Sequence, residues 1–98
     1  VIISCAGLYY RARPTRAFIT AYHSLRTANQ LKAQKQDKLA AKYYRQMIDV
    51  CNPVVNARDK WDNQDVISCI LLTGDAYKNL GQKQKALQYY EIVVQEYP

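Results

Sequence analysis

The stretch GDAYKNLGQKQKALQYYEIVVQEYP, from Gly74 to Pro98, decides the fold of this chain. Its apolar residues recur at helical spacing, which is broken once, at Asn79-Leu80-Gly81-Gln82. A glycine at such a break can close one helix in a left-handed cap before the next helix begins. The stretch therefore predicts two antiparallel helices joined by a very short turn, with small residues where the backbones approach closely: Gly74, Ala76 and Ala86.

The same helical spacing extends toward the N-terminus. Thr15 is expected to cap a helix that runs to about Gln34, and Asp37 to cap a further helix that Asn52-Pro53 ends. No glycine lies between these two helices, so the turn is expected to be looser than the one at Gly81. The residues predicted to face inward are Phe18, Ala21, Tyr22, Leu25, Ala28 and Leu31, then Leu39, Ala40, Tyr43, Tyr44, Met47, Ile48 and Cys51, then Val66, Ile67, Ile70, Leu71 and Tyr77, and finally Ala86, Tyr89, Tyr90, Val93, Val94 and Tyr97.

These patterns predict an all-α fold of about five helices, in antiparallel hairpins that form a single domain over residues 1–98. Trp61 lies between the hairpins and is expected to anchor that segment on the core, because so large a side chain is rarely left free. Asp62 or Asn63 is expected to cap the helix that follows. The predicted parts are a leading helix at 1–12, a hairpin at 15–52, a connector at 53–63 and a second hairpin at 64–98.

The positive charge is concentrated at the N-terminal end of the chain. Residues 1–36 contain six basic and no acidic residues, whereas residues 37–98 contain eight of each. Such a segment can attract an acidic protein face, anionic lipid or phosphate, or it can simply solvate a helix face. The residues of this candidate docking patch are Arg11, Arg13, Arg16, Arg26, Lys32 and Lys35.

The residue types that support catalysis, metal binding and secretion are not arranged for those roles. His23 is the only histidine, and no nucleophile or carboxylate stands at catalytic spacing from it. Cys5, Cys51 and Cys69 are odd in number and far apart, which predicts buried free thiols in a reducing compartment. We therefore expect neither an enzyme nor a cofactor. The location is expected to be intracellular, with the acid-free segment from Tyr9 to Arg26 leaving cytoplasm and mitochondrion both open.

An internal echo supports a repeat architecture: Ala40-Ala41-Lys42-Tyr43-Tyr44 returns 46 residues later as Ala86-Leu87-Gln88-Tyr89-Tyr90. Residues 67–98 moreover resemble a tetratricopeptide repeat, a 34-residue helical hairpin with small, aromatic and proline residues at fixed offsets. Residues 21–53 resemble it more loosely. The matching residues are Gly74, Tyr77, Gly81, Ala86, Tyr90 and Pro98.

The resemblance implies a right-handed superhelical stack of hairpins that binds protein partners without catalysis, as an adaptor or as a structural subunit of an assembly. In the family, the first helices of the hairpins line a groove for the partner. RNA binding is the alternative, because Tyr9, Tyr10, Phe18 and Tyr22 alternate with arginines as in a stacking platform. The groove positions implied for this chain are Ser68, Leu71, Leu72, Asp75, Lys78 and Asn79.

Overall fold

A computed structural model describes residues 14–98, and within them the chain is all-helical. The helices are α2 (Thr15–Ala33), α3 (Asp37–Asn56), α4 (Asn63–Asn79) and α5 (Lys83–Glu96), with a short 3-10 helix, η1 (Arg58–Lys60), between α3 and α4. This confirms the all-α prediction. The leading helix expected at 1–12 lies outside the described residues.

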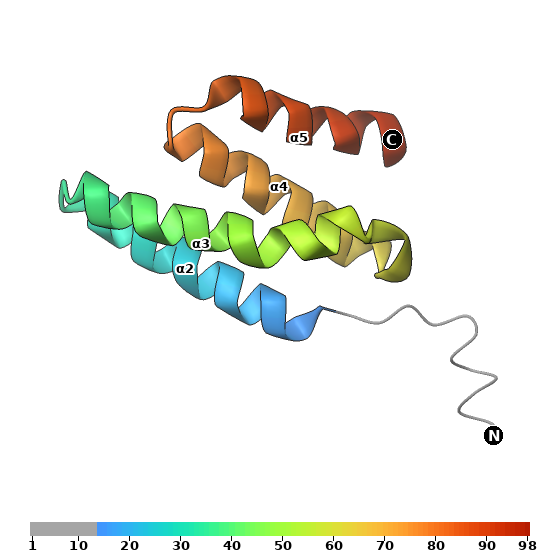
Figure 1. Cartoon of the computed structure of the whole chain (residues 1–98), viewed down its shortest axis with the longest axis horizontal. Helices are drawn as coiled ribbons and strands as arrows, with labels where there is room; N and C mark the ends of the chain where they lie inside the picture. Colours follow the sequence, from blue (N-terminus) through green and yellow to red (C-terminus); the bar gives the residue numbers. More distant parts are fainter. Residues whose placement is uncertain (1–13) are drawn as a thin grey trace.

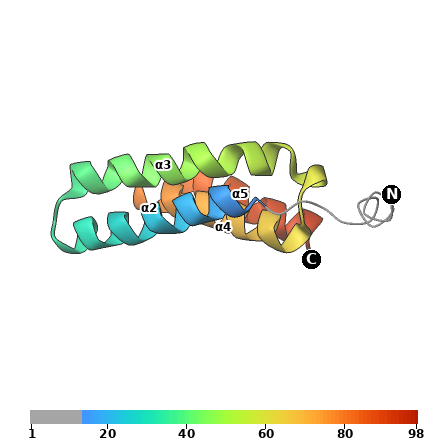
Figure 2. The ribbon, with the colours of Figure 1, turned by 90° about the horizontal axis from the view of Figure 1, so that it is seen from below.

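The four α-helices form two antiparallel hairpins, α2–α3 and α4–α5, which pack together through α3 and α4 (Figure 1). Both tight turns lie at one end of the molecule, and the α3–α4 connection lies at the other end, beside the C-terminus of α5. Seen from below, the helix axes lie roughly along the length of the molecule (Figure 2). Helix α3 packs between α2 and α4, and α4 packs between α3 and α5, so α5 completes the stack.

The core follows this arrangement, because most of the large side chains that are fully buried lie on α3 and α4. Tyr44, Met47 and Ile70 are the largest side chains that are fully buried. Cys51 and Cys69, also fully buried, are free thiols as predicted. The hydrogen bond with Cys51, together with burial, raises the pKa of the Cys69 thiol. The wider cluster comprises Ala21, Ala28, Ala40, Ile48, Val54, Val55, Val66, Leu72 and Ala76.

The two helix turns are built alike, although only one contains glycine. Gly81 has φ 80° and Lys35 has φ 62°, so both residues are in the left-handed region. In each turn the N–H of this residue bonds to the carbonyl three residues back, and the next N–H bonds to the carbonyl five residues back. This is the Schellman arrangement. The prediction of a looser first turn is therefore wrong, because the backbone bonds hold Lys35 in the conformation that glycine adopts more readily.

Replacing Lys35 with glycine is expected to raise the free energy of unfolding by about 0.5–1 kcal/mol. A left-handed conformation costs a residue with a side chain about 1–2 kcal/mol, and the greater freedom of glycine in the unfolded chain offsets part of the gain. Gly81→Ala is the matched reverse change and is expected to destabilise by about 1 kcal/mol. Urea unfolding measures the free energy of unfolding of both variants. Changes of the same sign in the two variants would contradict the prediction.

Helix α3 continues beyond its predicted end. Asn52-Pro53 was expected to end the helix, but Pro53 lies inside it and α3 extends to Asn56. Val54 and Val55, at 3% and 2% exposure, are buried by this extra turn. Burial of two valines stabilises by several kcal/mol, which exceeds the loss of one backbone hydrogen bond at the proline. The helix end predicted at Asn52-Pro53 is therefore wrong, and the segment between α3 and α4 is limited to residues 57–62.

The helix N-termini match the predicted caps only at α4. Asp62 caps α4, with its Oδ2 accepting the N–H of Gln64 at 3.1 Å, as predicted. The N-cap positions of α2 and α3 are held instead by Pro14 and Gln36, one residue before the predicted caps. In the connector, Trp61 is half-buried and packs against the core cluster, which confirms its predicted anchoring role.

Four side chains that were predicted to face inward are largely exposed: Tyr22 at 49%, Leu39 at 43%, Leu71 at 40% and Val94 at 72%. Each lies at the edge of an apolar stripe, where spacing alone cannot separate a buried residue from a boundary one.

Among the described residues, no helix is both long and apolar enough to cross a lipid bilayer.

Candidate partner-binding surface

The two hairpins repeat the same side-chain hydrogen bond at a spacing of 46 residues. The Tyr44 hydroxyl donates to Asn29 Oδ1 at 2.7 Å, and the Tyr90 hydroxyl donates to Asp75 Oδ1. Burial, together with the bond to the Asp75 carboxylate, raises the pKa of Tyr90 to about 12. Each bond ties the second helix of a hairpin to the first. Because the sequence echo and this contact have the same spacing, residues 46 apart occupy equivalent places in the two hairpins.

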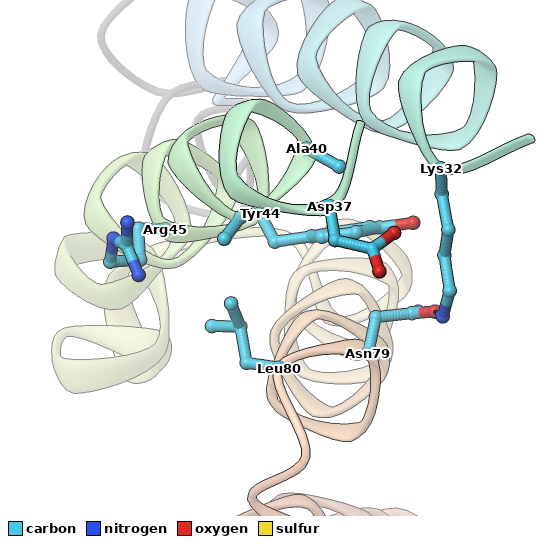
Figure 3. Close-up of a pocket in the computed structure, with 8 residues that line it drawn as sticks. Lys32, Asp37, Ala40, Tyr44, Arg45, Asn79 and Leu80 are labelled. Atoms are coloured by element: carbon cyan, nitrogen blue, oxygen red, sulfur yellow. Dashed lines mark hydrogen bonds between the residues drawn. The ribbon is translucent and has the colours of Figure 1, made fainter. Parts of the chain in front are cut away.

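In the first hairpin, the end of α4 covers the surface beside the tight turn. Lys32 Nζ donates to Asn79 Oδ1 at 2.7 Å, and Leu80 projects toward α3 (Figure 3). Asn79 Nδ2 in turn donates to the carbonyl oxygen of Asp75 at 2.8 Å, which fixes the amide. A pocket of about 330 Å³ remains at this junction. Its lining residues are Lys32, Asp37, Ala40, Ala41, Tyr44, Arg45, Asn79 and Leu80.

In the second hairpin the equivalent surface is open. It forms a depression of about 280 Å³, here called the α5 groove, lined by Lys78, Lys83, Ala86, Leu87 and Tyr90. Each of these five residues stands 46 positions after a residue that lines the first pocket. The difference is that no described element occupies the place that Asn79 and Leu80 take in the first hairpin.

The outer face of α5 carries two exposed apolar side chains, one in the groove and one further along the helix. Leu87 is 52% exposed and Val94 is 72% exposed. In the first hairpin their equivalents are the half-buried Ala41 and Ile48, which is only 7% exposed. The outer face of α5 thus repeats the pattern of a helix face that is buried in the neighbouring hairpin.

The six residues predicted to line the partner groove have unequal access. Leu72 is buried, so it belongs to the core and cannot contact a partner. Ser68 is half-buried, and its hydroxyl donates to the carbonyl of Gln64 at 3.1 Å. Asp75 and Asn79 are engaged with Tyr90 and Lys32. The structure leaves Leu71 and Lys78 exposed on α4.

The predicted basic docking residues do not form one cluster in the described part of the chain. Arg16, Arg26, Lys32 and Lys35 are all exposed. At about 100° per residue, Lys32 lies roughly 160° around α2 from Arg16 and faces α4. The basic groups therefore surround α2. Arg11 and Arg13 lie outside the described residues.

At the other end of the molecule, an ion pair ties the connector to the end of α5. Arg58 Nε and Nη2 each donate to a carboxylate oxygen of Glu96 at 2.8 Å, and Arg58 Nη1 donates to the carbonyl of Val55 at 2.9 Å. The two parallel bonds are the geometry in which arginine binds a carboxylate best. The ion pair holds the last turn of α5 against the connector, and it thereby helps to fix the position of the outer face of α5.

Stability is expected to depend on pH through this ion pair. The bond from Arg58 lowers the pKa of Glu96 in the folded chain. The stabilisation is therefore present above the ordinary glutamate value of about 4.3 and is lost as the pH falls through the lower, folded pKa. Glu96→Gln should lower the melting temperature at pH 7, and this effect should fade as the pH is lowered through the folded pKa of Glu96. Arg58→Gln should remove the same pH dependence, and a Glu96→Gln effect that stays constant down to the lowest pH at which the chain is folded would contradict the assignment.

Comparison with known families assigns the second hairpin. The tetratricopeptide repeat family model matches residues 68–98, which include most of α4, the Gly81 turn and all of α5. Residues 68–98 are thus similar to a tetratricopeptide repeat. This confirms the resemblance over about a third of the chain, and repeats of this kind generally mediate protein binding. Neither curated proteins nor solved structures give a significant match to the chain.

Sequence reasoning identified the tetratricopeptide repeat but did not predict the α5 groove residues as a site. Val94 follows the helical spacing of the core and was predicted to face inward, whereas Leu87 was assigned to no surface. The 46-residue spacing is the signal that distinguishes the exposed position from a core position. It pairs Val94, which is exposed, with Ile48, which is buried in the first hairpin. A repeat comparison of burial, position by position, reveals the open face.

Proposed function

We propose that the chain is a non-catalytic adaptor or a structural subunit of a larger assembly, which binds protein partners through its tetratricopeptide-like helical surfaces. The exposed apolar outer face of α5 is the observation that carries this proposal. Leu87 and Val94 lie 46 residues after positions that α4 helps to bury in the first hairpin. An exposed apolar face of this kind on a soluble helical stack marks a protein contact.

The arrangement of the hairpins supports the same function. Because α3 packs on α4 as α2 packs on α3, the hairpins form a stack to which a partner can add at the α5 end. We propose that the stack rises as a right-handed superhelix. Within it, Leu71 and Lys78 supply the exposed part of the groove along the first helices, and the basic residues of α2 contact an acidic or membrane-proximal surface.

RNA binding is the second candidate, and one observation favours it. Tyr22 was predicted to be in the core, but its ring is 49% exposed, and Arg26 lies one turn further along α2. An exposed aromatic ring beside an arginine is the pairing that stacks on an unpaired base. This candidate predicts affinity that falls steeply between about 50 and 200 mM salt and that is lost in Tyr22→Ala.

The test compares surface variants of the full chain expressed in its own cells. Leu87→Asp/Val94→Asp alters the outer face of α5, and Ile19→Asp alters a similarly exposed apolar residue on α2, at 67% exposure. Quantitative co-purification is expected to recover a defined set of proteins with the wild type and with Ile19→Asp, and to lose it with the double variant. Equal recovery by all three chains, at equal helicity, would overturn the proposal.

A further inference from the structure

The first hairpin shows what kind of surface covers the α5 groove. Lys78, Ala86 and Tyr90 are equivalent to Lys32, Ala40 and Tyr44, which line the pocket at the end of α4. In that pocket the cover is the C-terminal end of a helix. It presents a hydrogen-bond acceptor, Asn79 Oδ1, to the lysine, and then a leucine to the helix beneath (Figure 3). The α5 groove therefore has the shape and residues to receive another helix end of this kind.

The charges of the two sites differ at one lining position. Asp37 lines the first pocket, whereas Lys83 stands at its equivalent in the α5 groove. Two ammonium groups, of Lys78 and Lys83, therefore border the place where the acceptor would sit. The Asp75 carboxylate binds the Tyr90 hydroxyl, and Glu91, equivalent to Arg45, is exposed and does not line the groove. A carboxylate complements two ammonium groups better than the neutral amide of Asn79 does.

A second copy of the chain does not supply this cover. Stacking one copy on another would place α2 against the α5 groove, in the way that α4 covers α3. The residues of α2 equivalent to Asn79 and Leu80 are Ala33 and Gln34, which offer neither the acceptor nor the leucine. Moreover α2 contains basic residues and no acidic ones, so it would face the two lysines with like charge.

We propose that the α5 groove binds the C-terminal end of an amphipathic helix of a partner protein, in which an aspartate or glutamate is followed directly by leucine. The carboxylate pairs with Lys78 and Lys83, and the leucine lies on Ala86 and Leu87. This inference rests on the proposed function and adds the chemistry of the partner to it. It concerns the outer side of α5, which shares Lys78 with the groove along the first helices.

The test uses two labelled peptides with the sequence of α4 and its cap, residues 63–80, one carrying Asn79→Asp and the other Asn79→Lys, both with Cys69→Ser. Their apolar residues are identical, so any difference in binding reports the charge at position 79. Fluorescence anisotropy measures their affinity for the full chain and for the full-length variant Lys78→Glu/Lys83→Glu. Both lysines are exposed, and circular dichroism checks that the variant remains helical.

The aspartate peptide is expected to bind the wild type about three- to tenfold more tightly than the lysine peptide, with the order reversed on the double-glutamate variant. Raising the salt to 0.5 M should narrow both differences. Leu87→Asp should weaken both peptides on both chains, whereas Ile19→Asp should leave them unchanged.

Equal affinity of the two peptides, or an unreversed order, would overturn the proposed chemistry. Absence of peptide binding would overturn it as well, and the proposed function would still stand if co-purification depended on Leu87 and Val94. Sedimentation of the wild type that shows self-association lost in Leu87→Asp would assign the groove to a second copy instead.

Discussion

Replacing Tyr44 with alanine is expected to lower the free energy of unfolding by about 3–5 kcal/mol, the usual cost of removing a buried aromatic ring. Tyr44 is 2% exposed and lies in the core on α3. The change also removes the 2.7 Å bond to Asn29, which joins α3 to α2. A domain of this size is stable by about 4–13 kcal/mol in total. The variant should therefore lose a large fraction of the total stability.

Tyr90→Ala is the matched control, because Tyr90 takes the same place in the second hairpin and donates to Asp75 as Tyr44 does to Asn29. It is only half-buried, since the outer face of α5 is open. We expect a loss of about 1–2 kcal/mol, from partial burial and one hydrogen bond. Urea unfolding followed by circular dichroism measures both variants. Equal losses would mean that the two hairpins are equally covered in solution, contrary to the open α5 face.

The sequence predicted the helices and their pairing well, because helical spacing and turn residues are local signals. The Gly81 turn and the Asp62 cap follow from residue type alone. The end of α3 was not predictable in the same way. Pro53 disfavours a helix locally, and only the burial of Val54 and Val55 against other elements shows that the helix continues. Tertiary packing decides such a boundary, and packing is not visible in local sequence.

The candidate site was predictable in its family but only in part in its residues. Leu72 was assigned to the partner groove, but it is buried, because a family position specifies a helix face and not its depth. The four described basic residues are spread over several sides of α2 and the turn after it, because a count of charges along a sequence does not say on which side of a helix each charge lies. The α5 groove required a comparison of burial at equivalent positions, and that comparison needs coordinates.

The central position of α4 leads to a second large effect. Ile70 is fully buried on this helix, which packs on α3 on one side and on α5 on the other. Ile70→Ala is expected to lower the free energy of unfolding by about 2–5 kcal/mol, from lost burial and the cavity that remains. The loss should fall toward the upper end of this range, because two packed helices restrict how far the cavity can collapse.

The equivalent position in the first hairpin provides the control, because it is Ser24, equally buried but polar. Its hydroxyl has no hydrogen-bond partner among the described residues. Ser24→Ala should therefore stabilise the chain by about 0.5–1 kcal/mol, through the better helix propensity of alanine and the removal of an unpaired buried hydroxyl. Urea unfolding should thus show changes of opposite sign in the free energy of unfolding for Ser24→Ala and Ile70→Ala, although the repeat makes the two positions equivalent. If Ser24→Ala destabilised the chain as Ile70→Ala does, the Ser24 hydroxyl would have a bonding partner in solution, and its assignment as unpaired would be wrong.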